Sequence, residues 1–391
     1  MTNKRFTLTV NEINALGLKQ GNADSRYRLT AEQQDLLFEF RGLRDDVPFG
    51  IQDACNNVGV SPKDVKMLWL KTKGESVRIE NPYYQEREEK EKEDILERFL
   101  ERFEEKINKL NFESPTPSGV HNDDGFDRLV YTDTHIAMNP NPTGYSLYGG
   151  VWNEKEVMER LDIMLSFVVR NQRNSTLLID DLGDFFDGFD GKTVRREHDL
   201  PQNMDNQTAF DVGFQFKVKM IDILSRFYSK IICHNVCESN HSSSFDYIVN
   251  SAFKVYAEKV YGVEVMNFRK FIDHYQFANR IFILCHGKDS TNLKFGFKPF
   301  LDPVQREKIN DYIDTHFLLQ KDVKIEFSKG DSHQYIFDSS SSDRFDYFNY
   351  PAFSPSSSWV QTNFKKGKSG FVFFNYNETR VINDYLFEWK S

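Results

Sequence analysis

Apolar and polar residues alternate in a regular way from residue 126 to the end of the chain. Short apolar runs, which are typical of buried strands, lie between longer stretches whose apolar residues recur at helical spacing. The runs cover residues 129–131, 177–179, 231–232, 281–284 and 323–327, with two more at 371–374 and 385–387. The helical stretches cover about residues 154–170, 209–228, 245–261 and 303–317. Strands joined by helical crossovers predict a layered α/β domain.

Residues 30–79 instead show only helical spacing. Thr30 and Gln33 form the capping-box pattern that begins a helix, and Gly59 marks the turn before the last helix of the segment. This order of helix, glycine turn and helix resembles helix-turn-helix DNA-binding domains. The lysines expected on or just after its recognition helix are Lys63, Lys66, Lys71 and Lys73. The alternative is an ordinary helical hairpin whose lysine-bearing face is merely solvated.

Composition changes again between residues 86 and 119. Residues 86–110 are highly charged but keep an apolar stripe at helical spacing, which predicts a helix that docks on another domain or on a second copy of the chain. A proline- and serine-rich run at 114–119 breaks this helix. We therefore expect a small all-α, helix-turn-helix-like module (1–85), a charged amphipathic helix with its linker (86–119), and an α/β domain (120–391).

Five of the apolar runs of the α/β region are followed by side chains that can bind a metal ion. Open α/β sheets place their ligand sites at the carboxyl ends of strands, so these side chains can meet. Asp184 lies on a short turn after run 177–179. The others are Asp133, His135, Asn240, His241, His286, Asp331 and His333. Singly, each could cap a turn or be a hydrogen-bonded structural residue. Together, oxygen and nitrogen donors without thiolates suit Mn²⁺, Fe or Zn²⁺.

Composition narrows the classes of function. The chain has 391 residues, of which 39% are hydrophobic, enough for two or three domains. Its formal net charge of −9 argues against a protein that coats a polyanion, so contact with nucleic acid would need a local basic patch. The four cysteines include no complete zinc-ligand set and favour a reduced, cytoplasmic protein. No apolar run approaches the ~20 residues of a membrane span, so we expect no membrane contact.

The order of the metal-binding residue types is similar to the motif set of the calcineurin-like metallophosphoesterases. The set is Asp-x-His, Gly-Asp with a following Asp-Gly, Asn-His, a lone His and Gly-x-x-His, over about residues 126–338. The resemblance implies a four-layer α/β/β/α sandwich with two divalent metal ions at the strand ends. It assigns Asp133, His135 and His333 to one ion, and Asn240, His286 and Asp331 to the other. Asp184 would bridge the ions, and His241 would stabilise the phosphate and protonate the leaving oxygen.

Two positions depart from the family's pattern. Asp331 stands where the family usually has the first histidine of Gly-His-x-His, which adds a negative charge and favours Mn²⁺ or Mg²⁺ over Zn²⁺. Ser239 and Ser242 flank the Asn-His pair in place of the usual glycine and aspartate, and neither change removes a ligand. We expect Mn²⁺ first, with Mg²⁺, Fe or Zn²⁺ as alternatives.

The expected reaction is phosphoester hydrolysis. Two divalent ions ~3.5–4 Å apart can hold a bridging hydroxide at neutral pH and clamp the phosphate oxygens. Arg195, Arg196 and His198 follow the bridging aspartate and are expected to bind substrate, the alternative being an ordinary charged loop. Together with the helical module, the centre predicts a DNA nuclease, similar to repair exonucleases and to phage-encoded members of the family. Such a protein would act in the cytoplasm, that of the host if it is phage-encoded.

Two other functions stay open. One is a phosphomonoesterase or small-nucleotide phosphodiesterase whose helical module only mediates assembly, for example of a homodimer. The other is a catalytically inactive DNA-binding or virion scaffold. No Walker-type loop occurs in the sequence, so ATP-driven remodelling would need a separate ATPase partner.

Aromatic residues in the serine-rich stretch 339–358 also have two interpretations. Phe345, Tyr347, Phe348 and Tyr350 could stack on bases in a single-stranded channel, or they could pack a long loop onto the domain.

Overall fold

The computed structural model divides the chain into two units, Met1–Asp94 and Ile95–Ser391. It describes residues 5–6, 8, 10–19, 27–30, 32–33, 36–37, 98, 100–105, 107, 115–120, 122–145, 150–291, 293–295, 299–357, 367–377 and 381–389. The division falls inside the charged segment 86–119, and the predicted domain limits stay a prediction. None of the helices in the described parts is long and apolar enough to cross a membrane.

The first unit is described only in part. Strands β1 (Arg5–Phe6) and β2 (Tyr27–Arg28) form a short antiparallel pair, and helix α1 (Val10–Ala15) lies between them in the sequence. The sequence had suggested a purely helical module, whereas the unit also contains this short pair of strands. The predicted capping box is present, since the backbone N–H groups of Thr30 and Gln33 each donate to the other's side chain. Lys63, Lys66, Lys71 and Lys73 lie outside the described residues, so the helix-turn-helix stays a prediction.

The second unit contains a six-stranded sheet in the order β13-β12-β3-β4-β5-β6. Its strands are β3 (Gly125–Tyr131), β4 (Thr176–Asp181), β5 (Lys230–Val236), β6 (Glu264–Phe268), β12 (Gly370–Asn377) and β13 (Val381–Glu388). Strands β3 to β6 are parallel, and β12 pairs antiparallel with β3 and β13. The carboxyl ends of β3, β4 and β5 therefore meet at one edge of this sheet.

A second, five-stranded sheet has the order β10-β11-β9-β8-β7. Its strands are β7 (Asp273–Phe277), β8 (Arg280–Cys285), β9 (Lys324–Lys329), β10 (Ile336–Asp338) and β11 (Asp346–Asn349). Strands β8 and β9 are parallel, with Cys285 opposite Lys329 at their carboxyl ends. The loops that follow them are therefore neighbours, although they are far apart in sequence.

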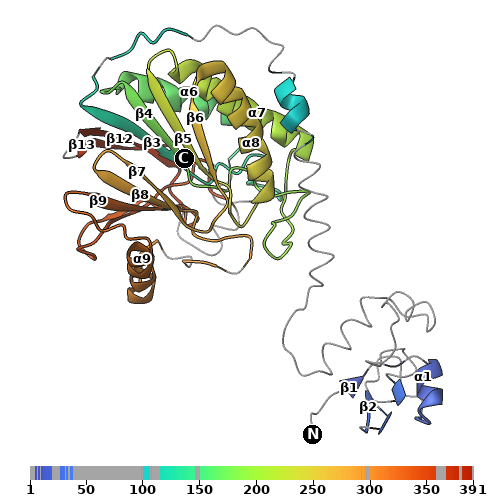
Figure 1. Cartoon of the computed structure of the whole chain (residues 1–391). Helices are drawn as coiled ribbons and strands as arrows, with labels where there is room; N and C mark the ends of the chain where they lie inside the picture. The colour runs from blue at the N-terminus through green and yellow to red at the C-terminus, as the bar shows by residue number, and fades with distance from the viewer. Residues whose placement is uncertain are drawn as a thin grey trace. The chain divides into compact units, whose positions relative to one another are not determined.

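Helices cover the outer face of each sheet (Figure 1). Helices α6 (Glu154–Arg170), α7 (Asn206–Leu224) and α8 (Ser244–Tyr261) pack on the six-stranded sheet, and α9 (Pro303–Thr315) packs on the five-stranded one. A third apolar cluster fills the space between the sheets. The predicted four-layer α/β/β/α sandwich is confirmed. The four predicted helices are also present, each within a few residues of its expected ends.

Charged side chains cross the space between the sheets next to this apolar cluster. Arg128 of β3 lies 2.6 Å from an oxygen of Asp180 on β4, and Arg280 of β8 lies 2.5 Å from an oxygen of Glu326 on β9. Arg128 also reaches the other oxygen of Glu326 at 3.4 Å. All four side chains are buried. We name them the intersheet network.

The aromatic residues of the serine-rich stretch belong to the core. Asp346–Asn349 is strand β11, paired with β9, and Phe345, Tyr347, Phe348 and Tyr350 are all buried. The base-stacking interpretation is therefore wrong, because these rings pack against protein. The charged amphipathic segment also docks in part, since the ring of Phe103 packs edge-on against Phe214 of α7.

Candidate metal centre

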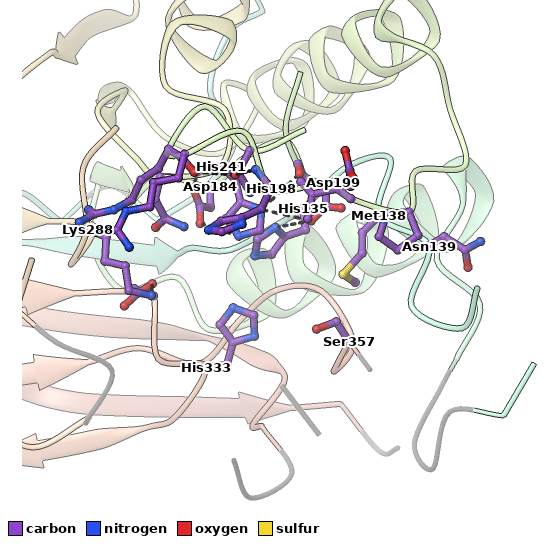
Figure 2. A pocket seen from close by; sticks show the side chains of 18 of the residues that line it. His135, Met138, Asn139, Asp184, His198, Asp199, His241, Lys288, His333 and Ser357 are labelled. Atoms are coloured by element: carbon purple, nitrogen blue, oxygen red, sulfur yellow. Dashed lines mark hydrogen bonds and ion pairs between the residues drawn. The ribbon is translucent and has the colours of Figure 1, made fainter. Parts of the chain in front are cut away.

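The predicted metal-binding residues converge from five loops at the carboxyl ends of parallel strands. Asp133 and His135 follow β3, Asp184 follows β4, Asn240 and His241 follow β5, His286 follows β8, and Asp331 and His333 follow β9. Figure 2 shows His135, Asp184 and His241 gathered on one side of a cavity, with His333 reaching toward them from the other side. The structure thus brings the predicted side chains together, and their role as ligands stays a prediction.

The backbone around the centre adopts conformations that non-glycine residues rarely take. Asp133, His135, Asp184, Asp331 and His333 have φ angles of 52°, 46°, 48°, 64° and 48°. Neighbouring loops hold one another in place, because the N–H of Asp133 donates to Gly183 and that of His135 donates to Asp184, both at 3.0 Å. Left-handed backbone at such residues costs energy and tends to occur at functional sites. Five such residues among the predicted ligands therefore favour a functional centre.

The first group of ligand atoms belongs to Asp133, His135 and His333, and lies within 4.8 Å. Asp133 Oδ1 is 3.2 Å from His333 Nε2 and 3.6 Å from His135 Nε2. Burial raises the pKa of the Asp133 carboxyl, but the two imidazoles lower this pKa by more than burial raises it. The pKa of Asp133 therefore lies well below the usual 3.8. An ionised carboxylate beside two imidazole nitrogens is a suitable donor set for a divalent cation.

Asp184 lies at the middle of the centre. Its Oδ2 is 2.9 Å from His286 Nε2, and its Oδ1 accepts a hydrogen bond from the backbone N–H of His241 at 3.0 Å. Burial raises the pKa of Asp184, but His286 and His241 lower it far below its usual range. Burial lowers the pKa of His286, and Asp184 raises it to about 9. Asp184 forms one group with Asp133 and His286 and another with His135 and His241, which is the position expected of a bridging ligand.

Two buried atoms of the second predicted ligand set, Asn240 Oδ1 and Asp331 Oδ2, make no hydrogen bond within the described parts of the chain. A buried polar atom without a partner costs about 1–3 kcal/mol, so such atoms are seldom left unpaired. The third predicted ligand atom, His286 Nε2, lies 2.9 Å from Asp184 Oδ2, and Asp133, Asp184 and His286 offer ligand atoms within 4.8 Å of one another. The residues present therefore fit a second metal ion.

His241 is placed to donate a proton. Its Nδ1 lies 3.2 Å from the main-chain carbonyl oxygen of Asp187, which fixes the ring, while Nε2 lies 4.0 Å from Asp184 Oδ2. Its side chain is 22% exposed, which leaves access to the cavity. Burial lowers the pKa of His241, but Asp184 and Asp187 raise it above its usual value.

Two buried carboxylates that contact the predicted ligands or the turn that carries them were not predicted from the sequence. Asp187 Oδ1 lies 3.0 Å from Nδ1 of His135 and 3.4 Å from Nδ1 of His241, so it orients both rings. Asp246 accepts hydrogen bonds from the backbone N–H groups of Phe185 and Phe186 and thereby anchors the turn that carries Asp184. Burial raises the pKa of Asp246 to about 7. Asp187 had a signal, the Asp-Gly that follows Gly-Asp, whereas Asp246 lies on a helix and had none.

The centre opens into a cavity of about 600 Å³. All three predicted substrate-binding residues line it, but they differ in what they contact. The guanidinium of Arg195 donates to the carbonyl oxygens of Asp289 and Leu293, both at 3.0 Å, and so joins two loops. Arg196 and His198 are exposed at the rim. Arg195 thus holds its loop against the loop of Asp289 and Leu293, and substrate binding by all three residues stays a prediction.

The known structures named below resemble this chain at low sequence identity. No family model matches the sequence, and no curated protein matches it. Among solved structures, the chain is similar to Vps29 complexed with Zn²⁺ from Entamoeba histolytica, at 12% identity over 67% of this chain and 98% of that one, with a TM-score of 0.30. A dimetal phosphatase from Danio rerio matches at 10% identity over 68% and 100%, with a TM-score of 0.35. A putative 5′-nucleotidase from Staphylococcus aureus in complex with α-ketoglutarate matches at 9% identity over 68% and 54%, with a TM-score of 0.31. At these values the likeness carries no inference about activity.

Proposed function

We propose that this chain is a metal-dependent phosphoester hydrolase that cleaves phosphodiester bonds of DNA at a two-metal centre. The observation that carries the proposal is that Asp184 belongs to two groups of closely spaced ligand atoms, one with Asp133 and His286 and the other with His135 and His241. Two buried oxygens beside the same cavity, Asn240 Oδ1 and Asp331 Oδ2, make no hydrogen bond within the described residues. Two divalent ions, when bound, supply a nucleophile from water at neutral pH and neutralise charge on the phosphate. No nucleophilic side chain is needed for this chemistry.

The chain's own residues would position the substrate and move a proton. His241, held by the Asp187 carbonyl, presents Nε2 to the cavity and would protonate the leaving oxygen. Asp187 would keep the rings of His135 and His241 in place. Arg196 and His198 at the rim would contact phosphate groups next to the scissile bond.

Support for DNA as the substrate is separate from support for the reaction. It comes from the exposed Arg196 and His198 and from the predicted lysine-bearing module at residues 30–79. Contacts from these groups to phosphate would make binding weaken as salt rises. A homodimer or an ATPase partner is compatible with the same proposal.

The runner-up is a phosphomonoesterase or small-nucleotide phosphodiesterase. One observation favours it: the cavity of about 600 Å³ is within the usual range for a small-molecule site. In that case the amino-terminal module would mediate assembly.

The test is hydrolysis by the chelator-treated full chain after Mn²⁺ is added back. End-labelled single- and double-stranded DNA, bis(p-nitrophenyl) phosphate and p-nitrophenyl phosphate would be compared, with Asp184→Asn and His241→Ala as controls. Metal-dependent DNA cleavage that both variants lose is the expected result. Turnover of the monoester without DNA cleavage would replace the proposal by the runner-up. No turnover of any of the four substrates would leave only the inactive scaffold.

A further inference from the structure

Lys288 lies at the edge of the candidate metal centre and contacts one of its predicted ligands. Its Nζ is 2.7 Å from Asp331 Oδ1, and both side chains are mostly buried, with exposed fractions of 10% and 4%. Figure 2 shows the Lys288 side chain extending along the wall of the cavity. The ammonium group of Lys288 thus contacts the Asp331 carboxylate, which is expected to bind the second ion.

The backbone fixes this contact. The loops after β8 and β9 lie against each other, since the N–H of Gly330 donates to the carbonyl oxygen of His286 at 3.0 Å. Gly287 has a φ of 123°, and a Cβ added there would lie 2.9 Å from Cβ of Asp331. A side chain at residue 287 would force the loops apart. The glycine therefore permits the close approach that brings Lys288 to Asp331.

The two oxygens of Asp331 have different surroundings. Oδ1 is bound by Lys288, whereas Oδ2 is buried and makes no hydrogen bond within the described residues. Asn240 Oδ1, which belongs to the same predicted ligand set, is in the same state. Lys288 thus leaves one oxygen of Asp331 for a ligand, rather than occupying both.

The charges around the three carboxylates of the centre also differ. Asp133 and Asp184 are surrounded by imidazoles, at 3.2 Å from His333 and 2.9 Å from His286. Asp331 differs from both, because its Oδ1 lies 2.7 Å from the ammonium group of Lys288. The pair of Asp331 and Lys288 is therefore neutral overall, while the Asp331 oxygen remains a donor.

We propose that Lys288 is a positioning and charge-balancing residue of the second metal site, which makes Asp331 act as a net-neutral ligand and thereby limits the affinity for the second ion. The inference rests on the proposed two-metal function. Two effects of removing Lys288 oppose each other: the carboxylate loses its fixed position, but the site loses a positive charge that repels the cation. Because charge interactions are strong in a desolvated site, the loss of repulsion is the larger effect. Lys288 therefore weakens and tunes this site.

The experiment is a titration of the chelator-treated full chain with Mn²⁺ at equilibrium. The concentration of free Mn²⁺ is measured by electron paramagnetic resonance. For Lys288→Met we expect the weaker of two sites to tighten by about tenfold or more, with the stronger site unchanged. Lys288→Arg keeps the charge and should retain the native affinities. Lys294→Met is the matched control, because it removes an exposed lysine of the same cavity, and it should leave both affinities unchanged.

A second variant guards against misfolding of the first. Lys288→Met combined with Asp331→His restores a neutral ligand without the ammonium, and should return the weaker site to near its native affinity. Unchanged or weaker binding in Lys288→Met, with two ions bound to the native chain, would overturn the inference and leave the proposed function standing. One ion in the native chain and two in Lys288→Met would also overturn it, because Lys288 would then occupy the second site. No ion bound to the native chain would refute the proposed function itself.

Discussion

Two regions of the second unit that bury carboxylates differ in the groups that neutralise them. In the intersheet network, Asp180 and Glu326 are paired with the guanidinium groups of Arg128 and Arg280. At the strand ends, Asp133 and Asp184 are paired with imidazoles, and nearby Asn240 and Asp331 each keep an oxygen without a hydrogen bond. Arginine is permanently charged, so the first region is complete as it stands, whereas the second can still accept a cation.

The difference between the partners of these carboxylates indicates that the intersheet network serves stability and the strand-end cluster serves function. Removing one partner of a buried ion pair leaves an uncompensated buried charge, which strongly destabilises the fold. A cluster of ionised carboxylates and imidazoles with unpaired atoms indicates a ligand site. Substitutions in the first region should therefore lower the free energy of unfolding, and substitutions in the second should lower activity.

The largest effect is expected at Asp184. Asp184→Asn removes the charge shared by both ligand sets, so hydrolysis should fall by about 10³-fold or more, since metal ions contribute several kcal/mol to transition-state stabilisation. The rate with bis(p-nitrophenyl) phosphate at saturating Mn²⁺ would be measured. Full activity of this variant would contradict the site assignment.

Asp184→Asn should also change how strongly Mn²⁺ stabilises the folded chain. An ion that binds only the folded chain stabilises it by about 2.7 kcal/mol at a concentration 100 times its Kd. Mn²⁺ should therefore raise the unfolding temperature of the native chain, and chelator should reverse the rise. In Asp184→Asn the rise should be largely absent, whereas an equal rise would mean that the ion binds elsewhere.

The second largest effect should come from the intersheet network. Asp180→Asn leaves the buried guanidinium of Arg128 without its nearest carboxylate, so the free energy of unfolding should fall by about 3–5 kcal/mol. Urea denaturation measures this loss. Activity per folded molecule should stay near native, because Asp180 contacts none of the predicted ligands. A large loss of activity with native stability would contradict the conclusion that the intersheet network serves stability rather than activity.

A smaller effect is expected at Asp187. Asp187→Asn keeps the size of the side chain but removes the charge that orients His135 and His241, so activity should fall by about 10–100-fold, the usual cost of losing a partner of a metal-binding histidine. Steady-state kinetics and Mn²⁺ affinity would be measured together. An unchanged affinity for Mn²⁺ and an unchanged rate would show that the two rings do not depend on Asp187.

The smallest effect concerns acid stability. Burial raises the pKa of Asp180, but Arg128 and His234 lower this pKa by more than burial raises it. The pKa of Asp180 in the folded chain therefore lies below the usual 3.8. A carboxyl with a lowered folded pKa stabilises the fold above its unfolded pKa, and this contribution disappears as pH falls through the folded value. The difference in unfolding free energy between the native chain and Asp180→Asn should therefore be full at pH 6 and shrink below about pH 4. A difference that grew on acidification would contradict the sign.

Those parts of the candidate site that follow from strand order could be predicted from the sequence. The convergence of the predicted ligands at the ends of β3, β4, β5, β8 and β9 was predictable because each follows an apolar run, and parallel strands end at one edge. The contact between Lys288 and Asp331 was not predictable, because the residues are 43 positions apart and meet only through the pairing of β8 with β9.

Two further features were hidden for local reasons. Strand β11 was missed because serines surround its aromatic residues, which gave the stretch the composition of a loop. The binding of Arg195 to Asp289 and Leu293 depends on the path of two loops, so a charged sequence could not distinguish this arginine from its neighbour Arg196.

The most direct test of the central claim is the number of Mn²⁺ ions that the chelator-treated full chain binds at equilibrium, compared with Asp184→Asn. Equilibrium dialysis followed by metal analysis gives this number without any assumption about the substrate. Our interpretation of the strand-end cluster predicts two ions per native chain and at most one, bound weakly, in the variant. No bound Mn²⁺ in the native chain, or the same binding in both proteins, would contradict it.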